Sequence, residues 1–224
     1  MFTGIIQAVG SVSAIEPRGG DLRVTLNTGA LDMAGVALGD SIAVNGVCLT
    51  VVELNDRGFV ADVSMETITL TSVGLWQVGM AVNCEQSLTP TTRLGGHLVS
   101  GHVDGLGEVI ERHPDARSER FTIAVPAELA RYIAHKGSIT VDGTSLTVNK
   151  VSGAEFELNI VPHTLEHTIF GAYQPGTKVN IEVDVIARYL ERLLLGDNDA
   201  GHEGNASLSE LAHSLLEQNS LLKR

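Results

Sequence analysis

Short segments of alternating apolar and polar residues follow one another along most of the chain. In the first half they are VTLNT (24–28), SIAVNGVCLTVVEL (41–54), GFVADVSM (58–65) and AVNCEQ (81–86). Such alternation, with short apolar runs inside it, is typical of half-buried strands. Asn45 and Gly46 separate two apolar runs, as do Asp142 and Gly143, and both dipeptides readily supply the positive φ angles of a tight hairpin. The pattern therefore predicts an all-β fold.

The strand pattern occurs twice. Residues 1–87 align with residues 98–184 without a gap when the chain is displaced by 97 positions, with 24 identities in the 87 pairs. SIAVNGVCLTV (41–51), for example, falls on SITVDGTSLTV (138–148). Since all the identities share one displacement, we infer a duplication. Six or so strands in about 90 residues predict one small closed β-barrel per copy, because closure leaves no exposed edge strand.

Four other segments interrupt or follow this pattern. ALDMAGV (30–36) and AELARYIA (127–134) predict short helices within the two copies. Residues 196–205 are polar and Gly-rich, as linkers are. Residues 206–224 have an amphipathic pattern, with Ser207 at the N-cap position and Glu210 three residues on.

The segment VIARYLERLLL (185–195) predicts a helix with one apolar face. Its apolar residues are Val185, Ile186, Tyr189, Leu190, Leu193 and Leu194. Both barrels are complete before this segment begins, so its apolar face needs another partner. The preferred interpretation is packing against the same helix of neighbouring chains, and docking on the chain's own barrel is the alternative.

Composition and charge restrict the class of protein. Hydrophobic residues make up 43% of the chain and charged residues 19%, as in globular proteins. The formal net charge of −12 opposes binding to nucleic acid or to an anionic membrane surface, which requires clustered Lys and Arg. No apolar run approaches the roughly 20 residues of a membrane span, and the start MFTGIIQAVG lacks the features of a signal peptide. With only Cys48 and Cys84, we expect free thiols in a cytoplasmic protein.

Matched polar pairs lie on the second strand of each predicted hairpin. Cys48 and Thr50 lie two residues apart on one strand face, and Ser145 and Thr147 occupy the same places in the second copy. These pairs predict one site in each copy. The alternative is a buried structural cysteine beside threonines that serve only as strand formers.

The histidines do not form a recognisable metal motif. His97 and His102 flank a Gly-rich segment, but no third ligand follows at a spacing typical of zinc sites. His163 and His167 in PHTLEH are four residues apart without the HExxH order, and Pro162 places them in a turn or at the start of a helix. Dinucleotide, Walker A and GxSxG motifs are absent from the sequence. We therefore expect solvent-exposed or capping histidines.

Six segments, in order, resemble the riboflavin synthase family of the α-chain type. They are MFTGII (1–6), NGVCLTV (45–51), GGHLVSGHVDG (95–105), DGTSLTVN (142–149), PHTLEHT (162–168) and VNIEVDVIARYLERLL (179–194). The resemblance covers residues 1 to about 195, and residues from Gly196 on lie outside it. It implies an enzyme that converts two 6,7-dimethyl-8-ribityllumazine molecules into riboflavin and a ribitylaminopyrimidinedione by transfer of a four-carbon unit. It also implies no metal and no organic cofactor.

The resemblance further implies a homotrimer held by its C-terminal helices, with each active site between the N-terminal barrel of one protomer and the C-terminal barrel of its neighbour. The expected parts are an N-terminal barrel (1–97), a C-terminal barrel (98–184), a trimerisation helix (185–195) and a linker with an amphipathic tail (196–224). The rival interpretation is a protein of the same fold that binds a lumazine or flavin without converting it. MFTG at the start, Cys48 and the two polar pairs favour the enzyme.

The resemblance also assigns site residues. The catalytic candidates are Phe2, Ser41, Cys48, His102 and Thr147. His102 or a hydroxyl would move the proton of the 7-methyl group, Cys48 or Ser41 would assist addition at C7, and Phe2 would cover the reacting pair. The substrate-binding candidates are Gly4, Ile5, Ile6, Cys48, Leu49, Thr50, Asp62, Val63, Ser64, Met65, Glu66, Thr67, Gly101, His102, Val103, Lys136, Ser145, Leu146, Thr147, Asn159, Ile160, Val161, Pro162, His163 and Thr164. Of these, residues 62–67 and 159–164 would offer backbone groups to the heterocycle.

Overall fold

The computed structural model describes residues 1–195 of the chain. The predicted linker and amphipathic tail (196–224) lie outside the described residues. Residues 1–184 form one compact unit, and the chain from Val185 on is a second unit. The first unit contains two antiparallel sheets of seven strands each, one per copy of the repeat. The predicted all-β duplication is therefore confirmed.

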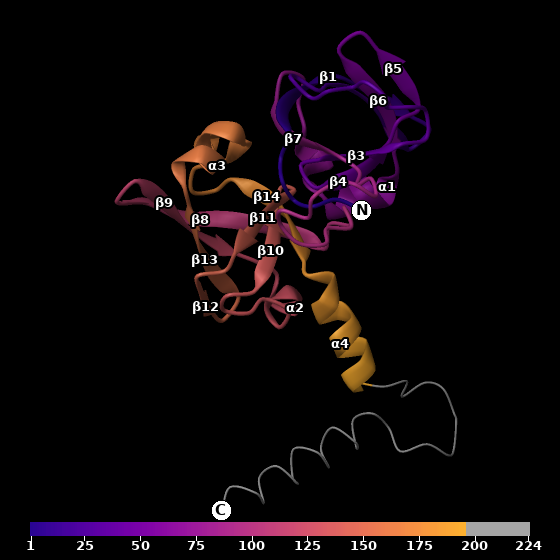
Figure 1. Cartoon of the computed structure of the whole chain (residues 1–224). Helices are drawn as coiled ribbons and strands as arrows, with labels where there is room; N and C mark the ends of the chain where they lie inside the picture. Colours follow the sequence, from indigo (N-terminus) through magenta and orange to yellow (C-terminus); the bar gives the residue numbers. More distant parts are fainter. Residues whose placement is uncertain (196–224) are drawn as a thin grey trace, which may run out of the picture. The chain divides into compact units, whose positions relative to one another are not determined.

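The two sheets have the same strand order. The N-terminal sheet runs β4-β3-β7-β1-β2-β6-β5 and the C-terminal sheet runs β11-β10-β14-β8-β9-β13-β12. The strands of the first are β1 (Ala8–Arg18), β2 (Asp21–Asn27), β3 (Ser41–Val44), β4 (Val47–Thr50), β5 (Glu53–Asn55), β6 (Gly58–Val63) and β7 (Ala81–Gln86). Those of the second are β8 (Gly105–Asp115), β9 (Ser118–Ala124), β10 (Ser138–Val141), β11 (Thr144–Thr147), β12 (Lys150–Ser152), β13 (Glu155–Ile160) and β14 (Lys178–Val183). Figure 1 shows the N-terminal strands curving around a common centre.

Each sheet encloses its own apolar core, because alternate side chains of its strands face inward. Phe59, Val24 and Leu26 are fully buried in the N-terminal core, and Phe121 and Phe156 in the C-terminal core. The predicted hairpins are also confirmed. Two residues connect β3 to β4 and two connect β10 to β11, and all four have positive φ angles.

The helical segments differ from the prediction. The short helices are α1 (Met65–Leu70), η1 (Ser72–Leu75), α2 (Ala127–Ala130), α3 (Pro162–His167) and η2 (Ile169–Ala172). The expected helix over 30–36 is wrong: the Asp32 carboxylate accepts the Ala34 N–H at 2.9 Å, and Gly35 has φ +85°, so turns replace the helix. The expected helix over 127–134 is only the four residues of α2.

Residues with the same place in the two copies meet between the sheets. Phe2 and Val99 form an isolated antiparallel bridge, and Gly46 and Gly143 approach so closely that a Cβ at Gly46 would lie 2.7 Å from the Gly143 nitrogen. Hydrogen bonds connect the copies reciprocally. Asn180 donates to the Asn45 carbonyl at 2.8 Å, and its counterpart Asn83 donates to the Asp142 carbonyl at 2.9 Å. The copies are therefore related by an approximate two-fold axis.

The second unit contains α4 (Val185–Leu195), the helix predicted from the apolar pattern. Tyr189, Leu190, Leu193 and Leu194 are each more than half exposed within this single chain. Among residues 1–195, none of the helices is long and apolar enough to cross a membrane.

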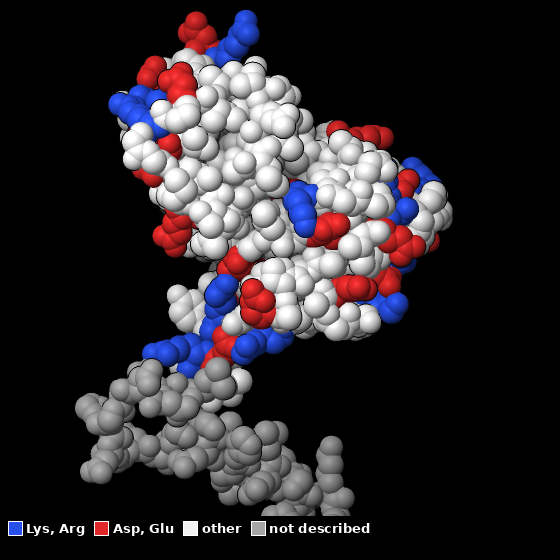
Figure 2. Space-filling model, turned by 180° about the vertical axis from the view of Figure 1, so that it is seen from behind, with Lys and Arg blue, Asp and Glu red and all other residues white. Residues whose placement is uncertain are grey.

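Figure 2 shows how charge is distributed on one face of the molecule. Acidic and basic side chains are interspersed along the outline of this face, and the broad white area between them is interrupted near its centre by a basic side chain beside an acidic one. On this face the negative charge of the chain is therefore spread out, with no dominant acidic patch on the described part.

Candidate active site

The structure has two cavities at matching places in the two copies. The N-terminal slot has a volume of about 240 Å³ and the C-terminal slot about 320 Å³. The N-terminal slot is lined by Val47, Cys48, Glu66, Thr67, Leu70, Thr71, Gly101, His102 and Val103. The C-terminal slot is lined by Ser145, Leu146, Thr147, Asn149, Asn159, Ile160, Val161 and Thr164. The repeat partners Cys48 and Ser145 thus occupy equivalent walls, as do Thr67 and Thr164.

A segment from the other copy contacts the β4 or β11 wall of each slot, and in the N-terminal slot this segment is part of the lining. Gly101, which precedes β8, accepts a hydrogen bond from the Cys48 N–H at 2.9 Å. Gly4, which precedes β1, accepts one from the Ser145 N–H at 2.7 Å. The chain therefore crosses between the copies just before the first strand of each sheet. This crossing brings His102 and Val103 beside Cys48.

Both crossing points require glycine. Gly101 has φ +80°, and a Cβ there would lie 2.7 Å from the Cys48 Cβ. Gly4 has φ +74°, and its Cβ would lie 2.5 Å from the Ser145 Cβ. A side chain at either position would be strained by the backbone angle and would collide with the wall of the slot.

The N-terminal slot combines a thiol with an imidazole. Cys48 is half-buried, and His102 is exposed on the wall of the same cavity. Phe2, predicted to cover the substrates, is instead fully buried beside Cys48, Ala43 and Val99. Its ring lies beneath Gly101, because a Cβ on that glycine would be 2.8 Å from Phe2 Cε2. Phe2 therefore supports the wall from behind.

A serine on the wall of the C-terminal slot, Ser145, is paired with His97, which is not itself a lining residue of that slot. The Ser145 hydroxyl lies 2.7 Å from His97 Nδ1, and the Thr140 hydroxyl lies 3.2 Å from His97 Nε2. Burial lowers the pKa of His97, and the charge of Asp184 partly opposes this effect. Burial therefore disfavours the protonated form of the His97 imidazole that lies against the Ser145 hydroxyl.

Sequence reasoning did not find the His97–Ser145 pair. His97 lies just before the second copy, at a position whose counterpart would precede Met1, so the repeat gives no partner for it. Only the fold brings His97 to β10 and β11. Comparison of the copies could not have revealed this residue.

Two predicted residues, Ser41 and Lys136, lie away from the walls of these slots in the described structure, whereas Thr147 lies on one of them. Ser41 pairs with Thr50 across β3 and β4 and lines a separate hollow of about 280 Å³ with Gln86 and Ser87. Lys136 is in the turn before β10 with φ +64°, and is exposed. Thr147 does line the C-terminal slot, opposite Ser138, the repeat partner of Ser41. The structure thus does not bring Ser41 and Cys48 into one cavity.

The remaining predicted binding residues divide into two groups. Residues 159–161 and Thr164 line the C-terminal slot, and Glu66 and Thr67 line the N-terminal slot. The other predicted binding residues in the described part of the chain line neither slot: Gly4, Ile5, Ile6, Leu49, Thr50, Asp62, Val63, Ser64, Met65, Pro162 and His163. Leu49 and Val63 are instead buried in the N-terminal core.

Backbone donors in residues 62–67 are partly occupied. The Asp21 carboxylate accepts the Met65 N–H at 3.0 Å, and the Ser64 hydroxyl accepts the Thr67 N–H at 3.3 Å as the cap of α1. These two N–H groups are therefore already hydrogen-bonded within the protein, and the expected backbone contacts of residues 62–67 to a heterocycle stay a prediction.

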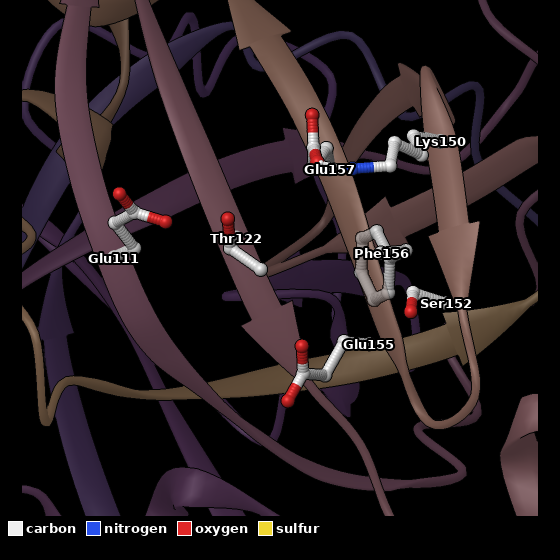
Figure 3. A pocket seen from close by; sticks show the side chains of 7 residues that line it. All are labelled: Glu111, Thr122, Lys150, Ser152, Glu155, Phe156 and Glu157. Carbon is white, nitrogen blue, oxygen red and sulfur yellow. Dashed lines mark hydrogen bonds and ion pairs between the residues drawn. The ribbon is translucent and has the colours of Figure 1, made fainter.

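A fourth hollow lies on the outer face of the C-terminal sheet (Figure 3). Glu111, Thr122 and Glu155 point into it from neighbouring strands, and Lys150 pairs with Glu157 at 2.7 Å. Its walls carry neither the thiol nor the serine–histidine pair. We therefore assign the chemistry to the two slots.

This architecture defines a class of protein: a duplicated sheet protein with one slot for a small molecule in each copy. The Lumazine binding domain family matches residues 3–87 and again residues 100–184. Riboflavin synthase of Photobacterium phosphoreum is 52% identical over 222 residues, which cover 99% of this chain and 100% of that protein. Riboflavin synthase of Photobacterium leiognathi is 50% identical over 197 residues, 88% of this chain and 90% of that protein. The chain belongs to the riboflavin synthase family of enzymes.

Two further observations qualify the sequence analysis. The 222-residue match extends into residues 196–224, which the motifs had left outside the resemblance. The fold is also similar to that of LumP in complex with 6,7-dimethyl-8-(1'-D-ribityl) lumazine, with a TM-score of 0.74, 23% identity, and coverage of 82% of this chain and 99% of that chain. At this identity the similarity concerns the fold alone.

Proposed function

We propose that this chain converts two molecules of 6,7-dimethyl-8-ribityllumazine into riboflavin and 5-amino-6-ribitylaminopyrimidinedione. One lumazine gives up a four-carbon unit and the other receives it. The two products together contain all the atoms of the two substrates, so the reaction needs no external oxidant or reductant. Membership of the riboflavin synthase family supports this proposal.

The observation that carries the proposal is a pair of matching slots with different chemistry. Their equivalent walls suit two identical substrates, whereas a donor and an acceptor of carbon need different catalytic groups. Cys48 and His102 line one slot, and Ser145, whose hydroxyl is paired with His97, lines the other. Holding the two heterocycles in register would supply much of the rate, because well-oriented intramolecular reactions gain about 7–11 kcal/mol.

The groups suggest a division of labour. At the C-terminal slot, His97 accepts a proton through the Ser145 hydroxyl, which lies 2.7 Å from its Nδ1, and burial lowers the pKa of this imidazole. In the N-terminal slot, the Cys48 thiol assists addition at C7 and His102 exchanges protons with the 7-methyl group. Ser41 and Thr147 remain catalytic candidates, Ser41 as the alternative to Cys48 for addition at C7.

A homotrimer is part of this proposal. We propose that each reacting pair forms between the N-terminal slot of one protomer and the C-terminal slot of its neighbour. The exposed apolar residues of α4 support such an assembly, because burying each one contributes about 1.5–3 kcal/mol. Residues 185–195 would then be the trimerisation helix that follows two barrels, 1–97 and 98–184. Strands β4 and β6 lie close together although they are not hydrogen-bonded neighbours, and this contact supports closure of the barrel.

We also propose a cytoplasmic location, which the free thiols of Cys48 and Cys84 suit.

The decisive experiment is incubation of the purified protein with 6,7-dimethyl-8-ribityllumazine alone, followed by riboflavin absorbance. We expect riboflavin and the pyrimidinedione in equal amounts. The alternative function, suggested by the LumP fold, is a carrier that binds the lumazine without converting it. Tight binding without riboflavin formation would establish the carrier and refute the enzyme.

A further inference from the structure

Two glutamates are buried at equivalent positions in the last strands of the two sheets. Glu85 on β7 is 2% exposed and Glu182 on β14 is 4% exposed. Burying a carboxylate is costly unless donors satisfy it. Their presence in both copies therefore suggests a function that apolar side chains could not perform.

Both carboxylates hold the crossing segments by the same three hydrogen bonds. Glu85 Oε1 accepts from the Thr3 N–H at 2.7 Å and the Thr3 hydroxyl at 2.6 Å, and Oε2 accepts from the Gly4 N–H at 3.0 Å. Glu182 Oε1 accepts from the Ser100 N–H at 2.6 Å and its hydroxyl at 2.7 Å, and Oε2 accepts from the Gly101 N–H at 2.9 Å. Each crossing glycine is thus fixed at its nitrogen by a buried carboxylate.

The carbonyl oxygen of each crossing glycine accepts a hydrogen bond from the slot of the opposite copy. Gly101 is held by Glu182 of the C-terminal sheet, yet its carbonyl accepts the Cys48 N–H of the N-terminal slot. Gly4 is held by Glu85 of the N-terminal sheet, and its carbonyl accepts the Ser145 N–H of the C-terminal slot. Each slot therefore depends on a carboxylate in the opposite sheet.

The geometry points to Glu182 as a positioning residue for the N-terminal slot and to Glu85 as a positioning residue for the C-terminal slot. Glu182 fixes the Gly101 wall and, through the chain, the place of His102 next to Cys48. Glu85 fixes Gly4, whose carbonyl accepts the hydrogen bond from the Ser145 N–H. An effect of these glutamates on catalysis rests on the proposed function. The dependence of each slot on the glutamate of the opposite sheet follows from the hydrogen bonds alone, and it can be tested without measuring turnover.

The test measures how fast iodoacetamide alkylates a thiol in each slot of the full-length protein. Cys48 reports on the N-terminal slot. In a background with Cys48→Ser and Ser145→Cys, the introduced thiol reports on the C-terminal slot. Cys84 is buried, and burial raises its pKa to about 12, so its reaction is slow.

We expect a crossed result. Glu182→Gln places an amide N–H₂ against a backbone donor and removes a hydrogen bond to a charged group. It should therefore speed alkylation of Cys48 about tenfold. It should leave the thiol of Ser145→Cys unaffected. Glu85→Gln should do the reverse. Glu157→Gln, on the outer face of the C-terminal sheet, is the matched control and should change neither rate.

Three outcomes would overturn the inference: unchanged rates, equal changes in both slots, or a change confined to the slot of the same sheet. If either glutamine variant fails to fold, Ser100→Ala and Thr3→Ala replace it, since each removes one donor and leaves the carboxylate. They should give the same crossed pattern with smaller ratios. Turnover of the lumazine is measured in parallel, and we expect Glu182→Gln to lower kcat more than it raises KM. A crossed alkylation pattern without any turnover would refute the proposed function but not the positioning.

Discussion

Phe2 and Val99, which occupy the same place in the two copies, pair with each other. The Phe2 N–H donates to the Val99 carbonyl at 2.7 Å, and the Val99 N–H donates to the Phe2 carbonyl at 3.1 Å. Both side chains are buried. A duplicated chain thus uses the start of each copy to join the two sheets, and the start of the chain is part of the core.

Because of this position, we expect Phe2→Ala to lower stability and turnover together. Deleting a fully buried Phe side chain costs about 3–5 kcal/mol. A Phe2 side chain that only covered the substrates would instead lose turnover with stability intact. Urea denaturation measures the difference, and Phe2→Leu, which fills more of the space, should lose much less. A stable Phe2→Ala variant would contradict the burial described here.

The His97–Ser145 pair predicts a specific kinetic defect. We expect His97→Gln to lower kcat strongly with little change in KM, because Gln keeps a hydrogen-bonding group but cannot take up the proton. Burial lowers the pKa of His97, so the acidic limb of the kcat profile should lie below the ordinary range of histidine and disappear in the variant. The kcat and KM of His102→Gln are measured in the same way for comparison. An unaltered kcat in His97→Gln would exclude the proposed base.

Exchange of the repeat partners tests how far the two slots differ. We expect Cys48→Ser to keep substantial activity, because Ser145 occupies the equivalent wall with a hydroxyl. Ser145→Cys should be more harmful, since a thiol is a weak hydrogen-bond partner for His97. Steady-state kinetics of both variants decide the matter. Equal losses would mean that the slots are chemically interchangeable.

Removal of α4 tests the assembly. We expect a chain that ends at Asp184 to sediment as a monomer and to lose turnover, while each slot still binds a lumazine. Tyr189→Glu in the full-length chain is a milder variant, because Tyr189 is 69% exposed within one chain and its replacement cannot disturb the sheets. A truncated protein that remains trimeric would show that other surfaces hold the protomers together.

Asp142 predicts a pH dependence of stability. It is buried, accepts hydrogen bonds from the Tyr173 hydroxyl and the Asn180 N–H, and burial raises its pKa from 3.8 to about 7. Between these values the folded state retains a proton that the unfolded state releases, so the free energy of unfolding falls as pH rises. Thermal unfolding at pH 4 and pH 7.5 should show this decrease.

We expect Asp142→Asn to reduce this decrease without loss of the fold. Asn45, at the equivalent position, already accepts the Asn83 N–H through its amide oxygen at 2.7 Å. Asp56→Asn, at an exposed turn, is the control. If the two variants show the same pH profile, Asp142 is not the responsible group.

The alternation of apolar and polar residues was enough to predict the strands, the hairpins and the duplication. These are local properties, since side-chain periodicity and the positive φ angles of Asn45, Gly46, Asp142 and Gly143 are set by neighbouring residues. The apolar stripe of α4 was predictable for the same reason. The helix expected over 30–36 failed because the Asp32 carboxylate and Gly35 stabilise turns that the hydrophobic pattern does not reveal.

Only the tertiary structure decided which copy completes which slot. The repeat alone pairs Gly4 with Gly101 and Cys48 with Ser145, but it does not show that Gly101 contacts Cys48 and Gly4 contacts Ser145. The same limit hid His97, which has no repeat partner and reaches Ser145 only through the crossing of the chain. Sequence periodicity determines which face of a strand is buried, whereas contacts between residues far apart in the chain depend on how the two sheets dock.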